Sequence, residues 1–340
     1  MSLAIETLLC AARDNNLLQA EQSALFLNAQ YHLDLDCFAK GDILCQQYFK
    51  PYYDVLQAKG FTICADIEVT AQSKDFVFLS LPKNMIEAHF LIAQGLLALK
   101  CGGMILCAAE NKTGGSRLQK MLSSFDVSDI AHESRNKCRA VWGRVGNLNM
   151  EAVQKALDAG QRQAILDGRF QSQPGIFGWD KVDKGSDILT RFISKDMKGK
   201  GADFGCGYGY LSEFILSHCR KVKRISCIDA DYRAIELCRK NLSRFEVDTP
   251  CYWADLSTPH PDLRNLDFIV MNPPFHEGKK QDLELGKAFI QSAHQSLRRG
   301  GRLWMVSNAH LPYENIVQDL FFECTKHHEG QGFKVFEGLK

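Results

Sequence analysis

The segment Gly201–Gly209, "GADFGCGYG", joins a short apolar stretch to a loop in which every second residue is glycine. The apolar stretch predicts a buried strand, and "YLSEFILSH" from Tyr210 has the spacing of a helix packed on it. Glycines at 205, 207 and 209 allow positive φ angles and let a ligand approach the backbone of this strand-to-helix turn. The segment therefore predicts the first strand, turn and helix of an α/β sheet.

The rest of the second half of the chain alternates strand and helix patterns, which is typical of a doubly wound, mostly parallel sheet. In such a sheet ligands bind at the carboxyl ends of the strands, where the strand order reverses. The last strand is expected to be antiparallel. The predicted strands after the first are "RISCIDA" from Arg224, "CYWADL" from Cys251, "LDFIVM" from Leu266, "GRLWMVSNA" from Gly301 and "FKVFEG" from Phe333, and the helices are "YRAIELCRKNLSRF" from Tyr232 and the segment through "KAFIQSAHQSL" from Lys287.

The composition fits two globular domains in a reducing compartment. The 340 residues include 45% hydrophobic and 24% charged residues, with a net charge of +1, which excludes a globally basic nucleic-acid binder. The start of the chain lacks a basic leader and cleavage site, and no apolar run has a membrane span's length, so we expect a cytoplasmic protein without membrane contact. The 13 cysteines are scattered without a CxxC pair, which predicts neither zinc nor disulfides.

Acidic residues at successive strand ends suggest what the glycine loop binds. The loop spacing is GxGxG and misses the GxGxxG of a dinucleotide site, so taken alone it is also compatible with a plain turn. Asp203 lies just before the loop, Asp229 could accept both hydroxyls of a ribose, and Asp255 could accept an adenine amine. Each acid alone is as compatible with a helix N-cap or turn. Together they predict a nucleoside pocket without a helix-held phosphate, which suits S-adenosylmethionine better than NAD.

The stretch "DFIVMNPPFHEG" from Asp267 ends a strand abruptly, because proline cannot donate a ladder hydrogen bond. The Asn272 side-chain oxygen and the Pro273 carbonyl can each accept one N–H of a planar amine and stabilise the charge that develops during methyl transfer. Pro274 would stiffen this acceptor pair, and Phe275 offers a face on which an unstacked base could lie. The alternative is that this stretch is only a stiff loop without a chemical role.

Taken together, "DFGCGYG", "CIDAD", "NPPFHEG", "RRGGRLWMVSNAHLPY" and "GFKVF" resemble the ribosomal RNA small subunit methyltransferase C family of bacterial 16S rRNA guanine-N2-methyltransferases. The resemblance covers essentially the whole chain, and the sister enzymes that act on large-subunit RNA are similar. It implies S-adenosylmethionine as cofactor and 16S rRNA, within the assembled 30S subunit, as substrate. It further implies two Rossmann-like methyltransferase domains in tandem, an N-terminal degenerate one and a C-terminal catalytic one with a seven-stranded, mostly parallel sheet.

The resemblance also implies cofactor-binding residues upstream of the glycine loop. "PGIFGWDKVDKGSDIL" from Pro174 is similar to the family's segment that closes over the methionine end of the cofactor, with Gly178 where the family tends to carry serine. The full set of expected cofactor-binding residues is Phe177, Asp183, Gly185, Ser186, Asp203, Gly205, Cys206, Gly207, Gly209, Asp229, Ala230, Asp255 and Asn272.

The first half of the chain resembles a worn copy of the second. "DFVFLSLPKN" from Asp75 aligns with "DFIVMNPPFH" from Asp267, and "LKCGGMILCAAEN" from Leu99 with "LRRGGRLWMVSNA" from Leu297, which suggests a duplication. In the first copy the acceptor motif has become Ser80 to Lys83, and "ALFLNAQYH" from Ala24 lacks the glycines, so we expect it to bind no cofactor. Two α/β domains with only a shared strand-helix alternation remain an alternative.

Basic residues outside the catalytic motifs are candidates for RNA contacts. "ESRNKCRAVWGRVGN" from Glu133 brings cations together with Trp142, a mixture suited to phosphates and one stacked base, although a solvated face is an equally good interpretation. The acceptor loop adds one histidine and two lysines, and the histidine needs no acid or base role. The candidate RNA-binding residues are Arg135, Lys137, Arg139, Arg144, His276, Lys279 and Lys280.

The sequence thus predicts an enzyme with a degenerate domain at 1–150, a linker helix at 151–172 and a catalytic domain at 173–340, acting as a monomer without a metal. Its proposed reaction is transfer of a methyl group to the exocyclic N2 of a guanosine in 16S rRNA. Alternatives are the same reaction on 23S rRNA, N6 methylation of DNA adenine and N5 methylation of protein glutamine. Two other classes are a nicotinamide-dependent oxidoreductase and a non-catalytic RNA-binding protein.

Overall fold

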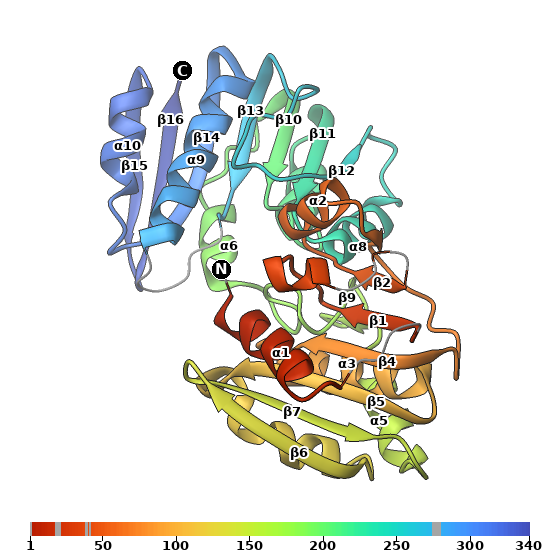
Figure 1. Cartoon of the computed structure of the whole chain (residues 1–340). Coiled ribbons are helices and arrows are strands. Elements are labelled where there is room, and N and C mark those ends of the chain that lie inside the picture. Colours follow the sequence, from red (N-terminus) through yellow and green to blue (C-terminus); the bar gives the residue numbers. More distant parts are fainter. Residues whose placement is uncertain (1, 18–21, 38–39, 41, 274–279) are drawn as a thin grey trace. The chain divides into compact units, whose positions relative to one another are not determined.

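The structure, a computed structural model, describes residues 2–17, 22–37, 40, 42–273 and 280–340 (Figure 1). Two compact units divide the chain. The first contains Met1–Arg162 and Gln173–Gly175, and the second contains Gln163–Ser172 and Ile176–Lys340. Each unit is described by itself below.

The sheet of the first unit has, within the described residues, seven strands in an order that reverses after the third (Figure 1). Strands β1 to β5 pair in parallel, whereas β7 pairs antiparallel with both β5 and β6. In sheet order the strands are β3 (Thr62–Cys64), β2 (Ile43–Gln46), β1 (Ala24–Leu27), β4 (Lys74–Ser80), β5 (Leu99–Glu110), β7 (Cys138–Arg144) and β6 (Ser128–Arg135).

Helices cover both faces of this sheet, because the inner strands are apolar on both sides. Leu25 and Leu27 of β1 belong to one buried cluster with residues of α3, α4 and α5, whereas Ala24 and Phe26 belong to another with residues of α1, η1 and α2. The helical elements of the first unit are α1 (Leu3–Asp14), η1 (Leu33–Cys37), α2 (Lys50–Ala58), α3 (Met85–Ala98), η2 (Asn111–Thr113), η3 (Gly115–Arg117), α4 (Leu118–Ser123) and α5 (Met150–Gly160).

The sheet of the second unit repeats the same order and the same directions within the described residues. The reversal of strand order lies between β10 and β13, which pair in parallel. In sheet order the strands are β12 (Cys251–Trp253), β11 (Lys221–Asp229), β10 (Lys198–Phe204), β13 (Leu266–Met271), β14 (Leu297–Asn308), β16 (Phe333–Leu339) and β15 (Glu323–Gly330), and a separate hairpin joins β8 (Gln163–Ile165) to β9 (Phe170–Ser172).

Helices again cover both faces. One face of the sheet packs on α6 and α7, and the other packs on α9 and α10. Helix α8 packs on β11 through Ile235, Cys238 and Leu242. The helices are α6 (Lys184–Thr190), α7 (Tyr210–His218), α8 (Tyr232–Leu242), α9 (Lys280–Ser296) and α10 (Tyr313–Leu320), and no helix in the described part of the chain is long and apolar enough to cross a membrane.

The segment expected to be a linker helix is only partly helical. Helix α5 starts with Asn149, whose side chain accepts a hydrogen bond from the backbone N–H of Ala152 at 3.0 Å, and it ends at Gly160. The following residues form the β8–β9 hairpin, whose turn places Leu166, Asp167 and Gly168 at positive φ. The helical spacing in the sequence therefore continues past the end of α5. The residues after Gly160 form a hairpin instead, because turn formation there outweighs their helical pattern.

Candidate active site and cofactor site

The glycine loop and the acceptor motif meet at the reversal of strand order. Phe204 ends β10 opposite Met271, which ends β13, so Gly205 and Asn272 leave adjacent strands at the same sheet edge. A Cβ added to Gly205 would lie 3.9 Å from the backbone oxygen of Asn272. The two motifs, which lie far apart in the sequence, thus form one site.

The loop itself depends on glycine. Gly205, Gly207 and Gly209 have φ of 77°, 54° and 95°, the left-handed region in which other residues are strained. A Cβ on Gly207 would meet nothing within 4 Å, so this residue leaves open space at the strand end. A Cβ on Gly209 would instead lie 3.0 Å from the sulfur of Cys238, so Gly209 serves close packing on α8.

The side chain of Asn272 is held in one orientation. Its amide nitrogen donates hydrogen bonds to Oδ1 of Asp183 at 2.6 Å and to Oγ of Ser186 at 2.9 Å. Asp183 is in turn the N-cap of α6 and accepts the backbone N–H of Ser186 at 2.9 Å. Because the carboxylate can only accept, the amide nitrogen must face it. The amide oxygen of Asn272 is therefore left as a directed acceptor.

A cavity of about 40 Å³ lies between these motifs. It is smaller than the roughly 300 Å³ at which ligand pockets begin. A nucleoside would therefore extend beyond it along the strand ends. Its lining includes seven of the predicted residues, Phe177, Asp183, Ser186, Gly205, Cys206, Gly207 and Asn272, together with Gly178, Tyr208, Tyr210 and Leu211, which were not predicted as ligand contacts.

Asp229 shapes the glycine loop from the end of β11. Its Oδ2 accepts the backbone N–H of Gly207 at 2.8 Å, and its Oδ1 accepts the N–H of Asp231 at 2.9 Å. Burial raises the pKa of this carboxyl group to about 6. Each carboxylate oxygen has two lone pairs, so both can still accept a ligand hydroxyl. The geometry fits the predicted ribose contact, although Asp229 does not line the small cavity.

Asp203 faces the first turn of α7. It is fully buried, and its Oδ2 accepts the N–H of Ser212 at 3.1 Å and the hydroxyl at 2.6 Å. Its other oxygen, Oδ1, is buried without a hydrogen-bond partner among the described residues. Burial raises the pKa of this carboxyl group to about 8. Asp203 therefore ties β10 to α7, and its role in binding the cofactor stays a prediction.

Comparison with known proteins places this site in a family. The profile of the "Methyltransferase small domain" family matches residues 167–337. The chain is 30% identical over 282 residues to ribosomal RNA small subunit methyltransferase C of Cronobacter sakazakii, which covers 82% of this chain and 79% of that protein. A Citrobacter koseri protein of the same name is 32% identical, covering 71% and 68%. The chain belongs to the ribosomal RNA small subunit methyltransferase C family.

The fold agrees with this assignment. A T. thermophilus 16S rRNA N2 methyltransferase, solved with AdoMet and guanosine, superposes on the whole chain with a TM-score of 0.80 at 19% identity, covering 92% of that protein. The predicted arrangement of two Rossmann-like methyltransferase domains in tandem is confirmed by this match and by the two seven-stranded sheets of the described residues.

Three further residues predicted for the cofactor site, Asp255, Ala230 and Gly185, do not line the small cavity. Asp255 closes a turn, since its Oδ1 and Oδ2 accept the N–H and the hydroxyl of Ser257, both at 2.8 Å. The backbone oxygen of Ala230 accepts the indole N–H of Trp253 at 2.8 Å. Gly185 packs closely, because a Cβ there would lie 3.0 Å from the ring of Phe333.

Part of the predicted acceptor loop lies outside the described residues. Pro273 is described and buried. Pro274, Phe275, His276 and Lys279 are not among the described residues, and the same holds for the side chain of Lys280, whose backbone begins α9.

The predicted basic cluster of the first unit does not gather on one face. Side chains alternate along β7, so Arg139 points to one side of the sheet, and Trp142 and Arg144 point to the other. Trp142 packs partly against the core of α1. Arg135 pairs with Asp14 at 2.9 Å, and Arg144 donates to the backbone oxygen of Gly102 at 2.9 Å. Lys137 lies in the β6–β7 turn with φ of 59°. RNA binding here stays a prediction.

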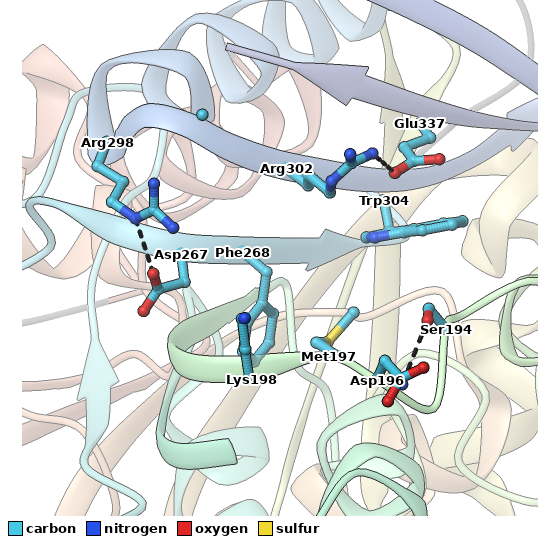
Figure 2. Close-up of a pocket in the computed structure, with 11 residues that line it drawn as sticks. Ser194, Asp196, Met197, Lys198, Asp267, Phe268, Arg298, Arg302, Trp304 and Glu337 are labelled. Atoms are coloured by element: carbon cyan, nitrogen blue, oxygen red, sulfur yellow. Dashed lines mark hydrogen bonds and ion pairs between the residues drawn. The ribbon is translucent and has the colours of Figure 1, made fainter. Parts of the chain in front are cut away.

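A larger cavity of about 460 Å³ lies at the other end of the strands of the second sheet, where β10, β13 and β14 begin (Figure 2). Four of its charged residues form two ion pairs, because Arg298 pairs with Asp267 at 2.7 Å and Arg302 pairs with Glu337 (Figure 2). Ligands of doubly wound sheets bind at the carboxyl ends of strands instead. Size alone therefore does not identify the active site of this family member.

Proposed function

We propose that the second unit transfers a methyl group from S-adenosylmethionine to the exocyclic N2 of a guanosine in 16S rRNA. The observation that carries the proposal is the anchoring of the Asn272 amide by Asp183 and Ser186 beside the glycine loop. Membership of the ribosomal RNA small subunit methyltransferase C family supports the same reaction and the same RNA.

Asn272 and Pro273 would hold the amine. The Asn272 amide oxygen and the Pro273 backbone oxygen are both acceptors, so they would select an NH₂ group over a carbonyl. Each would accept one N–H of the guanine amine and turn its nitrogen lone pair toward the glycine loop. They would also stabilise the positive charge that grows on the nitrogen as its bond to carbon forms. The charged amine then releases one proton to water.

The residues at the strand ends would hold S-adenosylmethionine, which supplies an electrophilic methyl group when bound. Gly205 and Gly207 leave the strand end open, and Asp229 offers the ribose hydroxyls a carboxylate whose position two backbone N–H groups fix. Asp255 would accept the adenine amine. Phe177, Asp183 and Ser186 would enclose the methionine end, since they line the cavity together with the glycine loop.

The remaining assignments complete the proposal. Pro274 would stiffen the acceptor pair, and Phe275 would stack on the guanine. The basic residues of β6 and β7, together with His276, Lys279 and Lys280, would contact the RNA backbone. The first unit would recognise the substrate without a cofactor. We infer that the enzyme acts as a monomer on the assembled 30S subunit in the cytoplasm and needs no metal for methyl transfer.

The decisive experiment is methyl incorporation from labelled S-adenosylmethionine into purified 30S subunits, with 50S subunits and naked 16S rRNA in parallel, followed by nucleoside analysis. The proposal expects N2-methylguanosine in the 30S sample. Label in 50S subunits alone would reassign the enzyme to large-subunit RNA. No label in any RNA, with the cofactor still bound, would point to DNA adenine or protein glutamine as the acceptor and would contradict the proposal.

A further inference from the structure

Four cysteines from four different elements meet beside the glycine loop. Cys227 lies on β11, Cys238 on α8, Cys251 on β12 and Cys206 in the loop itself. The sulfur atoms of Cys227, Cys238 and Cys251 all lie within 4.8 Å of one another. Cys206 packs in the same buried cluster as Cys227 and Cys238. None of these contacts is needed for the methyl transfer proposed above.

The sulfur atoms of Cys227, Cys238 and Cys251 form a triangle in which no two lie more than 4.8 Å apart, and Cys206 belongs to the same buried cluster. In a tetrahedral zinc site with Zn–S bonds of about 2.3 Å, the sulfur atoms lie about 3.8 Å apart. Small side-chain rotations would bring these sulfurs to that spacing.

The surroundings suit a metal held by thiolates. Cys206, Cys227 and Cys238 are buried in an apolar cluster with Ile235 and Leu242. The hydroxyl of Ser212 lies 3.2 Å from the sulfur of Cys227. The thiolate is the form of cysteine that binds metal, and a polar neighbour of this kind helps to fix the orientation of a ligand.

One end of the cluster opens toward solvent. Cys251 is only partly buried, and it lies on β12, the edge strand of the sheet. A metal ion could therefore enter past Cys251 without unfolding the unit.

We propose that Cys206, Cys227, Cys238 and Cys251 form a binding site for a soft divalent metal ion, with Zn²⁺ as the natural occupant. The sequence predicts no metal, because these cysteines form no CxxC pair and approach one another only through the fold. Bound metal would link the glycine loop to β11 at Cys227, two residues before Asp229, so it would stiffen the cofactor pocket. The metal takes no part in methyl transfer, and this proposal is independent of the RNA substrate.

The test is metal binding by the purified full chain, kept reduced with a phosphine. Zinc content is measured by mass spectrometry, and the thiolate-to-Cd²⁺ absorption band is measured during titration with Cd²⁺ alone. The test variant carries Cys238→Ser and Cys251→Ser together. Cys219→Ser is the matched control, because Cys219 is a buried cysteine of the same unit outside the cluster.

We expect about one metal ion per chain in the wild type and the control, and at least a tenfold weaker affinity in the double variant. Zn²⁺ should also raise the melting temperature of the wild type and of the Cys219→Ser control, but not that of the double variant. Absence of the Cd²⁺ band from the wild type, or an unchanged band in the double variant, would overturn the proposal and leave the cysteines as apolar packing. If the double variant does not fold, Cys251→Ser at the partly buried position gives the same comparison.

Discussion

The two units share one scaffold and differ at three strand ends. In both, the strand pairing shifts at the same place, between Lys74 and Phe76 in the first unit and between Leu266 and Phe268 in the second. Even an ion pair is repeated, because Lys100 contacts Asp75 at 2.7 Å as Arg298 contacts Asp267. The strand pairing places Asn28, Gln47 and Ser80 where the second unit has Gly205, Asp229 and Asn272.

At these three positions the first unit fills its own site. The amide nitrogen of Asn28 donates to the backbone oxygen of Ser80 at 2.8 Å, across the gap that Gly205 leaves open. Gln47 accepts the N–H of Phe49 at 2.8 Å, as Asp229 accepts that of Asp231, but its amide nitrogen donates to the oxygen of Ala29 at 2.6 Å. Backbone pairing and apolar burial therefore preserve the fold, whereas a few side chains at the strand ends decide whether a ligand fits.

The largest effect is expected for Asn272→Ala, which removes the anchored acceptor. Methyl incorporation should fall by about 10² to 10³, the loss typical of one preorganised electrostatic contact, while cofactor affinity changes little. Single-turnover labelling of 30S subunits and calorimetric titration with S-adenosylmethionine measure the two quantities. Ser80→Ala, at the matching position of the first unit, is the control and should leave turnover unchanged. An equal loss of turnover and of cofactor affinity would contradict the assigned role.

Gly205→Asn copies the filled position of the first unit into the second. Asparagine tolerates the left-handed backbone, as Asn28 does with φ of 51°, so the variant should fold. Its side chain should reach the oxygen of Asn272 and lower cofactor affinity by at least about tenfold, or 1.4 kcal/mol. Calorimetric titration measures this loss, and the reverse change Asn28→Gly should create no affinity. Unchanged binding by a folded Gly205→Asn protein would show that the cofactor lies elsewhere.

A pH dependence should follow from Asp229. Burial raises its folded-state pKa to about 6, above the usual carboxyl value near 3.9, so the carboxylate is ionised above pH 6 and protonated below it. If ribose binding needs the carboxylate, cofactor affinity should fall about tenfold between pH 7 and pH 5. Asp229→Asn gives this position an amide, as Gln47 does in the first unit. This variant should bind the cofactor weakly, with an affinity that does not change between pH 7 and pH 5. A wild-type affinity that stays flat from pH 7 to pH 5 would refute the ribose contact.

The smallest effects are expected for the repeated ion pair. Both lysine and arginine partners are about half exposed, at 49% for Lys100 and 46% for Arg298, and solvent screens such pairs. Lys100→Ala and Arg298→Ala should each lower the free energy of unfolding by about 0.5 kcal/mol. Urea unfolding curves of the two variants and the double variant give the values. A loss above about 2 kcal/mol in one unit alone would show that the two pairs are not equivalent.

Much of the second sheet follows from the sequence because its strands are continuous apolar runs that glycines and prolines end. The alternation along β10 shows which way Asp203 points. Its neighbours Ala202 and Phe204 face α9 and α10, so the side chain of Asp203 faces α7 and bonds to Ser212, while its predicted cofactor contact stays a prediction. Near the site, Tyr208 and Tyr210 went unnoticed as cavity residues, although they flank Gly209 in the loop sequence.

Contacts between distant residues were beyond the sequence. The bond from Asn272 to Asp183 spans 89 residues, and only resemblance to a family suggested that Asp183 belongs to the site. The cysteine cluster gave no signal, because no local spacing marks thiols that come from a loop, two strands and a helix. The periodicity of a sequence predicts which face of a helix or strand is buried, but it does not predict which helices and strands contact each other.

The β8–β9 hairpin bears on how the protein can be dissected. A fragment beginning at residue 173 would omit Phe170, whose ring lies 5.4 Å from that of Tyr208, and Gln171, whose N–H bonds to Asn241 at 2.8 Å. It would thereby remove the support of the glycine loop while keeping every residue of the loop. Because Gln173–Gly175 group with the first unit, no single cut separates the two. An inactive fragment cut at that point would say nothing about whether the first unit is needed for methylation.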